Sequence, residues 1–294
     1  MEPTTAEQSQ EKIEFPKGQL IESVPFQTYA DSEGINAGGL KEVLRSPAHY
    51  YAARYEKVER KETPALQLGK LFHYAVLEAE LFREKYVVQP KCDMRTNAGK
   101  LQMAEWKETI KPDAIIVPEQ FVATLTGMAE SILKHPISKT LLAKGVRETT
   151  IFWDDKKTGE LCKARPDFIT HEGYCLDLKT VEDARWGGFK HSIKKYMYHL
   201  QASHYLQAGR ETKQYDPKVY FWLCIEKVPP YGVINYQMGE QCLERGDEFR
   251  EQAMRIYAEC KKKNVWPTYD FKAQVAEFEP NDLYYDMELL EEPS

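Results

Sequence analysis

The sequence predicts an α/β fold in which helices flank a sheet. Helical patterns fill the first half of the chain, three short strand patterns follow one another over residues 149–179, and a helix and two further strands come next. This order of helix, antiparallel strands, helix and strand suits an α/β core. We expect the functional groups on the central hairpin of that core.

Four helical segments are predicted before the strands. The first spans residues 38–59, and Ser46-Pro47 marks either a break or the start of a second helix, because proline restricts the residue before it and fits a first helical turn. The others span 66–82, 96–111 and 118–135. Apolar positions in 66–82 are spaced as on one face of an amphipathic helix.

The second half of the chain alternates strands and helices. Strands are predicted at 149–153, 161–170 and 174–179, because β-favouring runs are bounded there by turn residues. A helix then ends near Gly209, since glycine favours helix ends. The remaining predicted elements are that helix at 189–207, a second hairpin formed by 219–226 and 233–237, and a last helix at 240–263.

The hairpin of residues 161–179 places acidic groups together. A turn centred on Glu172 sets Asp167 opposite Asp177, and the period-two alternation of strands puts Lys179 on the same face. Cβ atoms of directly opposite residues lie roughly 4.5–5.5 Å apart. Two such carboxylates can hold one divalent cation through oxygen, so this face is the predicted site of the chemistry.

The same register predicts that Arg165 faces Lys179. Like charges directly opposite each other destabilise a strand pair, so an anion is expected between them. The carboxylates supply part of it and a phosphate group would complete it, so Arg165 is expected to contact a phosphate. Pro166 cannot donate to a strand ladder, and this leaves open a slip of one residue in the pairing.

The hairpin carries a recognisable motif. It consists of an acid preceded by proline, a nine-residue gap and an Asp-x-Lys run. Asp167, Asp177 and Lys179 at this spacing resemble the PD-(D/E)xK nuclease motif. Upstream, Gly69-x-x-x-His73 with Glu78 resembles the helix before the catalytic strands in the RecB-like branch. The resemblance implies a restriction-endonuclease-like core with a central mixed sheet flanked by helices.

Two more positions extend the resemblance to the RecB-like branch. Glu148 matches its acidic position before a strand, and Gln201-x-x-x-Tyr205 matches its downstream helix motif. From the residues alone, Gln201 and Tyr205 share a helix face, and they fit either a catalytic site or DNA contact, or core packing of the tyrosine. Glu148 fits either a metal site or an ordinary surface acid.

Three further segments resemble RecE-type phage and prophage exonucleases, and the similarity covers roughly residues 26–270. They are Asn36–Leu40, Leu44–Tyr50 and Pro64–Gly69. The resemblance implies an exodeoxyribonuclease VIII-like enzyme that degrades linear double-stranded DNA from its ends, expected 5′ to 3′, in phage-type recombination. It also implies a ring-shaped homo-oligomer and a single-strand annealing protein as partner.

The expected cofactor is Mg²⁺ or Mn²⁺. Carboxylates and carbonyl oxygens suit these cations, which polarise a phosphate and lower the pKa of bound water. Lys179 would orient that water or neutralise charge on the phosphate. By resemblance His73 adds an imidazole ligand, although a lone histidine at this spacing also fits packing. The predicted metal ligands are His73, Glu148, Asp167, Asp177 and the Leu178 carbonyl.

The charge distribution allows contact with DNA despite a net charge of −6. Residues 277–294 carry seven acids and no base, so the rest of the chain is about +1. Arg45 could capture a terminal 5′-phosphate through its guanidinium fork. A cluster in residues 185–195 fits either a phosphate-binding patch or a solvated helix face. Its members are Arg185, Lys190, Lys194 and Lys195.

Composition indicates the cellular location and the division of the chain into domains. Six cysteines without any C-x-x-C pair indicate reduced thiols in a cytoplasmic protein. No run is apolar and long enough for a membrane span, and the start lacks a signal peptide's apolar region. We expect a mobile segment at 1–24, one exonuclease domain at 25–276 and an acidic tail at 277–294.

Two alternatives to the exonuclease remain open at this stage. One is a structure-selective endonuclease, because the same active-site chemistry serves end entry and internal cutting. The other is a catalytically inactive DNA-binding relative. An inactive relative would be expected to lose an acid or the lysine of the motif, and all three are present here.

Overall fold

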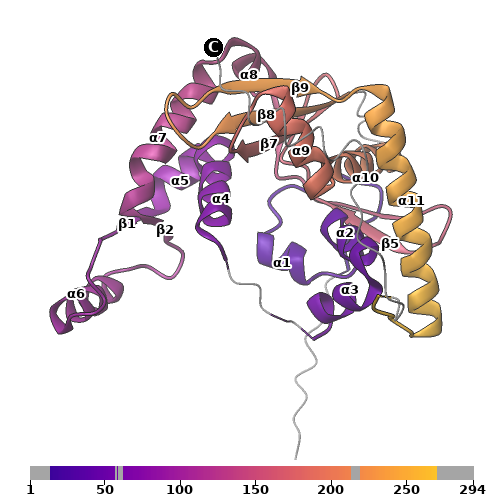
Figure 1. The fold of residues 1–294 in the computed structure, drawn as a ribbon, viewed down its shortest axis with the longest axis horizontal. Coiled ribbons are helices and arrows are strands. Elements are labelled where there is room, and N and C mark those ends of the chain that lie inside the picture. The colour runs from indigo at the N-terminus through magenta and orange to yellow at the C-terminus, as the bar shows by residue number, and fades with distance from the viewer. Residues whose placement is uncertain (1–13, 57, 59–61, 213–218, 270–294) are drawn as a thin grey trace, which may run out of the picture.

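The computed structural model describes residues 14–56, 58, 62–212 and 219–269 (Figure 1). Its centre is a five-stranded sheet in the order β3-β6-β7-β8-β9. β7 and β8 run parallel and the other neighbours are antiparallel, so the sheet is mixed, as predicted. The strands are β3 (Gly145–Arg147), β6 (Phe168–Thr170), β7 (Tyr174–Val181), β8 (Val219–Glu226) and β9 (Val233–Gln237).

Two smaller sheets lie beside the central one. β4 (Ile151–Asp154) pairs with β5 (Leu161–Ala164), and β1 (Tyr86–Gln89) pairs with β2 (Ile115–Pro118). The prediction of one strand over 161–170 is therefore wrong, because β5 and β6 belong to different sheets. Pro166 lies between them and has no N–H for a ladder, so the chain leaves one sheet there and enters the next.

The described helices surround these sheets. Their bounds are α1 (Phe26–Asp31), α2 (Ala37–Arg45), α3 (Pro47–Arg54), α4 (Pro64–Leu77), α5 (Ala79–Lys85), α6 (Asn97–Glu108), α7 (Glu119–Lys134), α8 (Pro136–Leu141), α9 (Trp186–Tyr196), α10 (Tyr198–Glu211) and α11 (Glu240–Lys263). Ser46 caps α3 and Pro47 opens it, so the second of the two readings for 38–59 is confirmed.

Two segments predicted as single helices are each broken in two. Residues 66–82 divide at Glu78, which leaves helical geometry with φ −119° and ψ 45°. Residues 189–207 divide at Met197, which is left-handed with φ 50° and ψ 47°. This conformation costs a non-glycine residue about 1–2 kcal/mol. Neither break is marked by glycine or proline, which is why the sequence pattern did not predict it.

The two faces of the central sheet bury different cores. Phe168, Leu176 and Leu178 pack with residues of α4 and α7. Cys175 and Trp222 pack on the other face with residues of α9 and α10. Because strand side chains alternate, Asp177 and Lys179 project on the side of α9 and α10. Figure 1 shows these two helices together at one side of the sheet.

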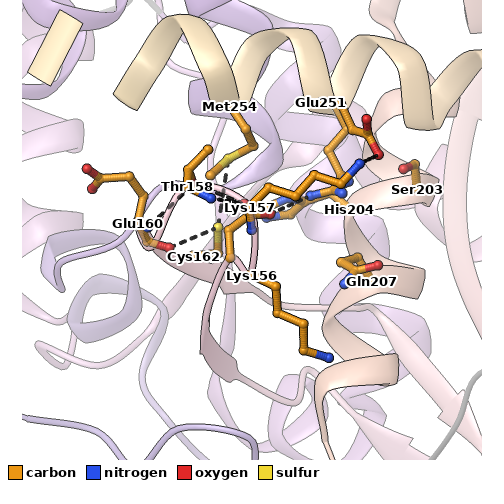
Figure 2. Close-up of polar contacts among 12 residues, drawn as sticks. Lys156, Lys157, Thr158, Glu160, Cys162, Ser203, His204, Gln207, Glu251 and Met254 are labelled. Atoms are coloured by element: carbon orange, nitrogen blue, oxygen red, sulfur yellow. Dashed lines mark hydrogen bonds and ion pairs between the residues drawn. The ribbon is translucent and has the colours of Figure 1, made fainter. Parts of the chain in front are cut away.

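The long helix α11 is fastened to the β4–β5 hairpin by a buried ion pair. Arg250 Nη1 donates to Asp155 Oδ2 over 3.1 Å, and both side chains are buried. Burial opposes ionisation of Asp155, but hydrogen bonds from Arg250 and Thr158 outweigh it and lower the pKa of the carboxyl. Figure 2 shows the surrounding contacts, including Lys157 with Glu251 and Cys162 with Met254.

Arg250→Ala is expected to lower the free energy of unfolding by about 3–5 kcal/mol, because it leaves the buried Asp155 carboxylate without its cation. Since Asp155 has a lowered pKa in the fold, its stabilisation is present above its unfolded pKa and is lost as the pH falls through the folded value. Urea unfolding at pH 7 measures the loss. The exposed Arg255→Ala on the same helix serves as the control, and an equal loss there would contradict the assignment.

The described part of the amino-terminal segment runs beside β4. Phe15 stacks on Phe152 with ring centroids 4.7 Å apart, and Ile21 forms a bridge to Thr150. In the described part of the expected mobile segment, Gly18 and Ile21 form backbone hydrogen bonds to Phe152 and Thr150. Residues 1–13 and the acidic tail lie outside the described residues. Within the described part of the chain, no helix is long and apolar enough to cross a membrane. All six cysteines lie within the described residues, and none of them is in a disulfide bond.

Candidate active site

Three potential metal ligands from three separate elements converge at one edge of the central sheet. His73 comes from α4, Glu148 follows β3 and Asp167 precedes β6. One ligand atom of each lies within 4.8 Å of those of the other two. The residues are 94 positions apart at the extremes, so only the tertiary fold brings them together.

Asp167 is held by the backbone of the neighbouring strand. Phe168 pairs with Leu176 and Ile169 with Cys175, which confirms the predicted register of the hairpin. Beyond the last pair, the Leu178 N–H donates to Asp167 Oδ2 over 2.8 Å. Burial and the nearby charge of Asp177 raise the pKa of Asp167 well above its ordinary value. The carboxylate is therefore costly to ionise unless a cation approaches.

His73 presents one ring nitrogen to this carboxylate. Its Nε2 lies 3.1 Å from the Leu178 carbonyl oxygen, which can only accept, so Nε2 carries the proton. Nδ1 then carries the available lone pair and lies 3.6 Å from Asp167 Oδ2. Burial lowers the pKa of His73 and favours the neutral ring. A neutral imidazole with its other nitrogen fixed in this way is the usual form of a metal-binding histidine.

Glu148 is positioned by its backbone and by Arg165. The residue has φ 47°, and its N–H donates to the Asp167 carbonyl over 3.0 Å. Arg165 Nε donates to Glu148 Oε2 over 2.7 Å, and its Nη1 donates to the Val24 carbonyl. Burial and the charge of Asp167 raise the pKa of Glu148 to about 7, against the opposing effect of Arg165.

The predicted pairing of Arg165 with Lys179 is wrong. β6 begins only at Phe168, so Arg165 lies outside the β6–β7 ladder. Its guanidinium is instead occupied by Glu148 and by the carbonyl of Val24, and the side chain is only 10% exposed. Arg165 therefore lies beside the acidic cluster, where it orients Glu148 and partly neutralises it.

Asp177 and Lys179 form a second, deeper part of the site. Lys179 Nζ is 2.5 Å from Asp177 Oδ2, and the Asp177 side chain is only 1% exposed. Gln201 Nε2 donates to the other oxygen of Asp177 over 3.0 Å. Burial alone would lower the pKa of Lys179, but the charges of Asp177 and Asp167 outweigh it and raise the value.

The sequence comparison decides the family of the chain. Residues 37–277, well over half of the protein, match a PDDEXK-like domain of unknown function (DUF3799). The chain belongs to this PDDEXK-like family. The resemblance to the PD-(D/E)xK superfamily is thereby confirmed. The narrower likeness to RecE-type exonucleases stays a prediction.

One solved structure shares the fold of this chain. The crystal structure of a protein from Eubacterium rectale, described as a "Putative exonuclease", aligns with a TM-score of 0.59 over 89% of this chain and 98% of that chain, at 11% identity. At that identity the similarity shows the fold alone. The structure of SSO0001 aligns over 81% of this chain and 92% of that chain at 14% identity, with a TM-score of only 0.27. No curated protein matches the sequence.

Two residues of the PDDEXK-like site were missed by the sequence analysis. Lys41 Nζ donates to Gln201 Oε1 over 3.1 Å, and burial together with the Lys179 charge lowers its pKa to about 7. The Tyr198 ring lies beside Lys179 Nζ, 4.5 Å from the ring centre. Tyr198 is three positions before Gln201, so helical spacing could have indicated it.

The other expected site residues are placed as follows. Tyr205 is partly buried and packs between two apolar clusters, and burial raises its pKa. Arg45 ends α2, and its side chain is 56% exposed and 3.9 Å from Glu42. Arg185 pairs with Asp183 just before α9. The three lysines of the cluster, Lys190, Lys194 and Lys195, are exposed on α9.

The donor set of the PDDEXK-like site suits a divalent cation. The two carboxylates suit both Mg²⁺ and Mn²⁺, whereas the imidazole nitrogen favours Mn²⁺ over Mg²⁺. Burial and then the charge of Asp167 raise the pKa of Glu148, and burial and then the charge of Asp177 raise the pKa of Asp167, so both carboxylates lie where negative charge is disfavoured. A cation between them would offset this cost. His73, Glu148 and Asp167 therefore fit a metal as its protein ligands.

Divalent cations are expected to raise the Tm of the protein more at pH 8 than at pH 5.5. The raised pKa of Glu148 means that the fold keeps a proton between pH 4.5 and about 7 that the unfolded chain has lost, so metal-free stability falls as the pH rises through this window. A cation competes with that proton. Saturation a hundredfold above Kd adds about 2.7 kcal/mol.

Thermal unfolding with and without MnCl₂ or MgCl₂ checks this expectation. Glu148→Gln should reduce the cation-induced increase in Tm and flatten its pH dependence. Glu130→Gln, on the exposed face of α7, is the matched control and should behave as the parent. A Tm that no divalent cation changes at either pH would show that the three ligands do not form a metal site.

Proposed function

We propose that this protein is a metal-dependent DNA exonuclease that hydrolyses phosphodiester bonds at the ends of linear duplex DNA. The observation that carries the proposal is the convergence of His73, Glu148 and Asp167 beside the buried Asp177–Lys179 pair. Membership of the PDDEXK-like family supports it. We assign the activity to residues 25–276.

His73, Glu148 and Asp167 would hold Mg²⁺ or Mn²⁺, with Asp177 as a further candidate from the sequence. The Leu178 carbonyl, also expected as a ligand, instead accepts from His73 Nε2 and so faces the ring nitrogen that points away from the other ligands. When bound, the cation supplies Lewis acidity at the scissile phosphate and lowers the pKa of a water molecule. The imidazole ligand favours Mn²⁺ in affinity. The fixed Nε2–Leu178 hydrogen bond keeps the His73 lone pair directed toward Asp167 before any substrate arrives.

Lys179 offers the positive charge that phosphate chemistry requires. Its ammonium is held by Asp177, whose other oxygen is fixed by Gln201, so little reorganisation is needed during reaction. A preorganised cation of this kind stabilises negative charge that develops on the phosphate. Gln201 and Lys41 act through Asp177 as positioning residues. Arg165 positions Glu148 in the same way.

The exonuclease proposal extends to the wider role. We propose 5′ to 3′ degradation by a ring-shaped homo-oligomer, in the cytoplasm, together with a single-strand annealing protein in phage-type recombination. The exposed lysines on α9 and Arg45 would contact the DNA backbone. The affinity of the protein for DNA should then fall as the salt concentration rises. Light scattering after gel filtration measures the oligomeric state.

Digestion of linear and covalently closed circular duplex in Mg²⁺ or Mn²⁺, with separate 5′ and 3′ end labels, tests the proposal. We expect release of nucleotides from the linear duplex, early loss of the 5′ label, resistance of closed circles and no reaction in EDTA. Efficient nicking of closed circles would favour a structure-selective endonuclease instead. Binding without cleavage under every metal would indicate a catalytically inactive DNA-binding relative.

A further inference from the structure

We propose that Tyr196 and Tyr198 form a stacking platform for an unpaired nucleobase of the strand being cut. The inference deepens the proposed function and rests on it. The Tyr198 ring lies 4.5 Å from Lys179 Nζ, and the Tyr196 ring stacks on Tyr198 with centroids 5.6 Å apart and an interplanar angle of 27°. Tyr196 is 49% exposed, so the two rings lead from the candidate active site to solvent.

The backbone break at Met197 creates this stack. In an unbroken helix each residue turns by about 100°, so Tyr196 and Tyr198 would point about 200° apart and could not touch. The left-handed Met197, with φ 50°, ends α9 and lets α10 begin in a new direction. Non-glycine residues in this strained conformation are concentrated at functional sites.

The surroundings of the outer ring carry positive charge. Lys195 Nζ lies 5.5 Å from the centre of the Tyr196 ring, and Lys190 and Lys194 are exposed on the same helix. Residues 186–196 contain no acid. Proteins hold single-stranded nucleic acid by combining aromatic rings for the bases with cations for the phosphates. The exposed tyrosine with its lysines matches this chemistry.

The distances limit how far the base would lie from Lys179. The path from Lys179 Nζ to the Tyr198 ring and on to the Tyr196 ring corresponds to about three stacking steps of ~3.4 Å, and a base on the outer face of Tyr196 adds one more. If Lys179 contacts the scissile phosphate, that base would belong to a nucleotide within about four positions of the bond that is cut. It must be unpaired, because both faces of a base inside a duplex are covered by its neighbours. The duplex end thus has to open before the strand reaches Lys179.

The platform is tested by a double-mutant cycle in which one change is made in the protein and the other in the DNA. Binding of a single-stranded oligonucleotide, and of copies with one abasic nucleoside at successive positions, is measured by fluorescence anisotropy in EDTA. Cleavage of linear duplexes with the same abasic positions is measured in Mn²⁺. The variants are Tyr196→Leu and Tyr196→Phe. Tyr86→Leu is the matched control, because Tyr86 is 45% exposed, stacks on Phe82 and begins β1. Figure 1 shows β1 well apart from α9 and α10.

Tyr196→Leu is expected to weaken oligonucleotide binding about tenfold, and Tyr196→Phe and Tyr86→Leu to leave it unchanged. One abasic position should weaken binding by the parent and raise its KM, but have no further effect on Tyr196→Leu, since the two changes remove the same contact. If the parent cleaves DNA, but Tyr196→Leu and the abasic position weaken binding additively, the platform is overturned while the proposed function stands. If the cycle holds without cleavage under any metal, the platform stands and the proposed function fails.

Discussion

Asp167→Asn is expected to reduce DNA cleavage by at least about a thousandfold, an effect typical of removing one member of a catalytic unit. The amide keeps an oxygen that can accept the Leu178 N–H, so the local backbone is preserved. The change removes the negative charge that faces His73 Nδ1 and Glu148. The loss should therefore arise from metal binding and chemistry, with little effect on folding.

The stability of the same variant separates these causes. Because the folded-state pKa of Asp167 is raised, metal-free stability of the parent falls as the pH rises from the unfolded pKa toward the folded one. Asp167→Asn should be at least as stable as the parent at neutral pH in EDTA, with a smaller increase in Tm on adding MnCl₂. Asp154→Asn, at an exposed position on β4, is the control for cleavage. Parental cleavage rates in Asp167→Asn would show that the active site lies elsewhere.

The elements that the sequence predicted best are those with regular patterns between clear turns. β8, β9 and α11 have the predicted bounds, 219–226, 233–237 and 240–263. β1, β2 and β3 were not predicted, because strands of three or four residues depend on pairing with distant partners more than on their own composition. The same dependence on pairing partners explains why residues 161–170 were wrongly predicted as one strand.

The candidate site also contains some residues that local sequence patterns predicted and others that they did not. Asp167, Asp177 and Lys179 lie on adjacent segments, so a turn and an alternating pattern were enough to bring them together. Lys41 contacts Gln201 across 160 residues of sequence, and no local pattern predicts that pairing. Arg165 was assigned to the wrong partner because the hairpin was extended through Pro166. Long-range packing therefore determines which charged residues complete the site.

Lys179→Met is expected to destabilise the fold and to reduce cleavage at the same time. Among the described residues, it leaves the Asp177 carboxylate, which is 1% exposed, with the Gln201 amide as its remaining hydrogen-bonding partner. Removing one partner of a buried pair typically costs about 3–5 kcal/mol. The raised folded-state pKa of Lys179 means that its stabilisation is present below the unfolded pKa and is lost only as the pH rises through the folded value, so the cost should appear in full at pH 7.

The double variant Asp177→Asn/Lys179→Met distinguishes the structural effect from the chemical one. Replacing both charges removes the buried unpaired carboxylate, so urea unfolding at pH 7 in EDTA should show that the double variant is more stable than Lys179→Met alone. Cleavage should stay at least about a hundredfold below the parent in both, because the cation that stabilises phosphate charge is absent. Lys227→Met, which breaks an ion pair with the exposed Glu182, should cost no more than about 1 kcal/mol. If the double variant recovers cleavage together with stability, Lys179 serves only to neutralise Asp177 and has no direct role at the phosphate.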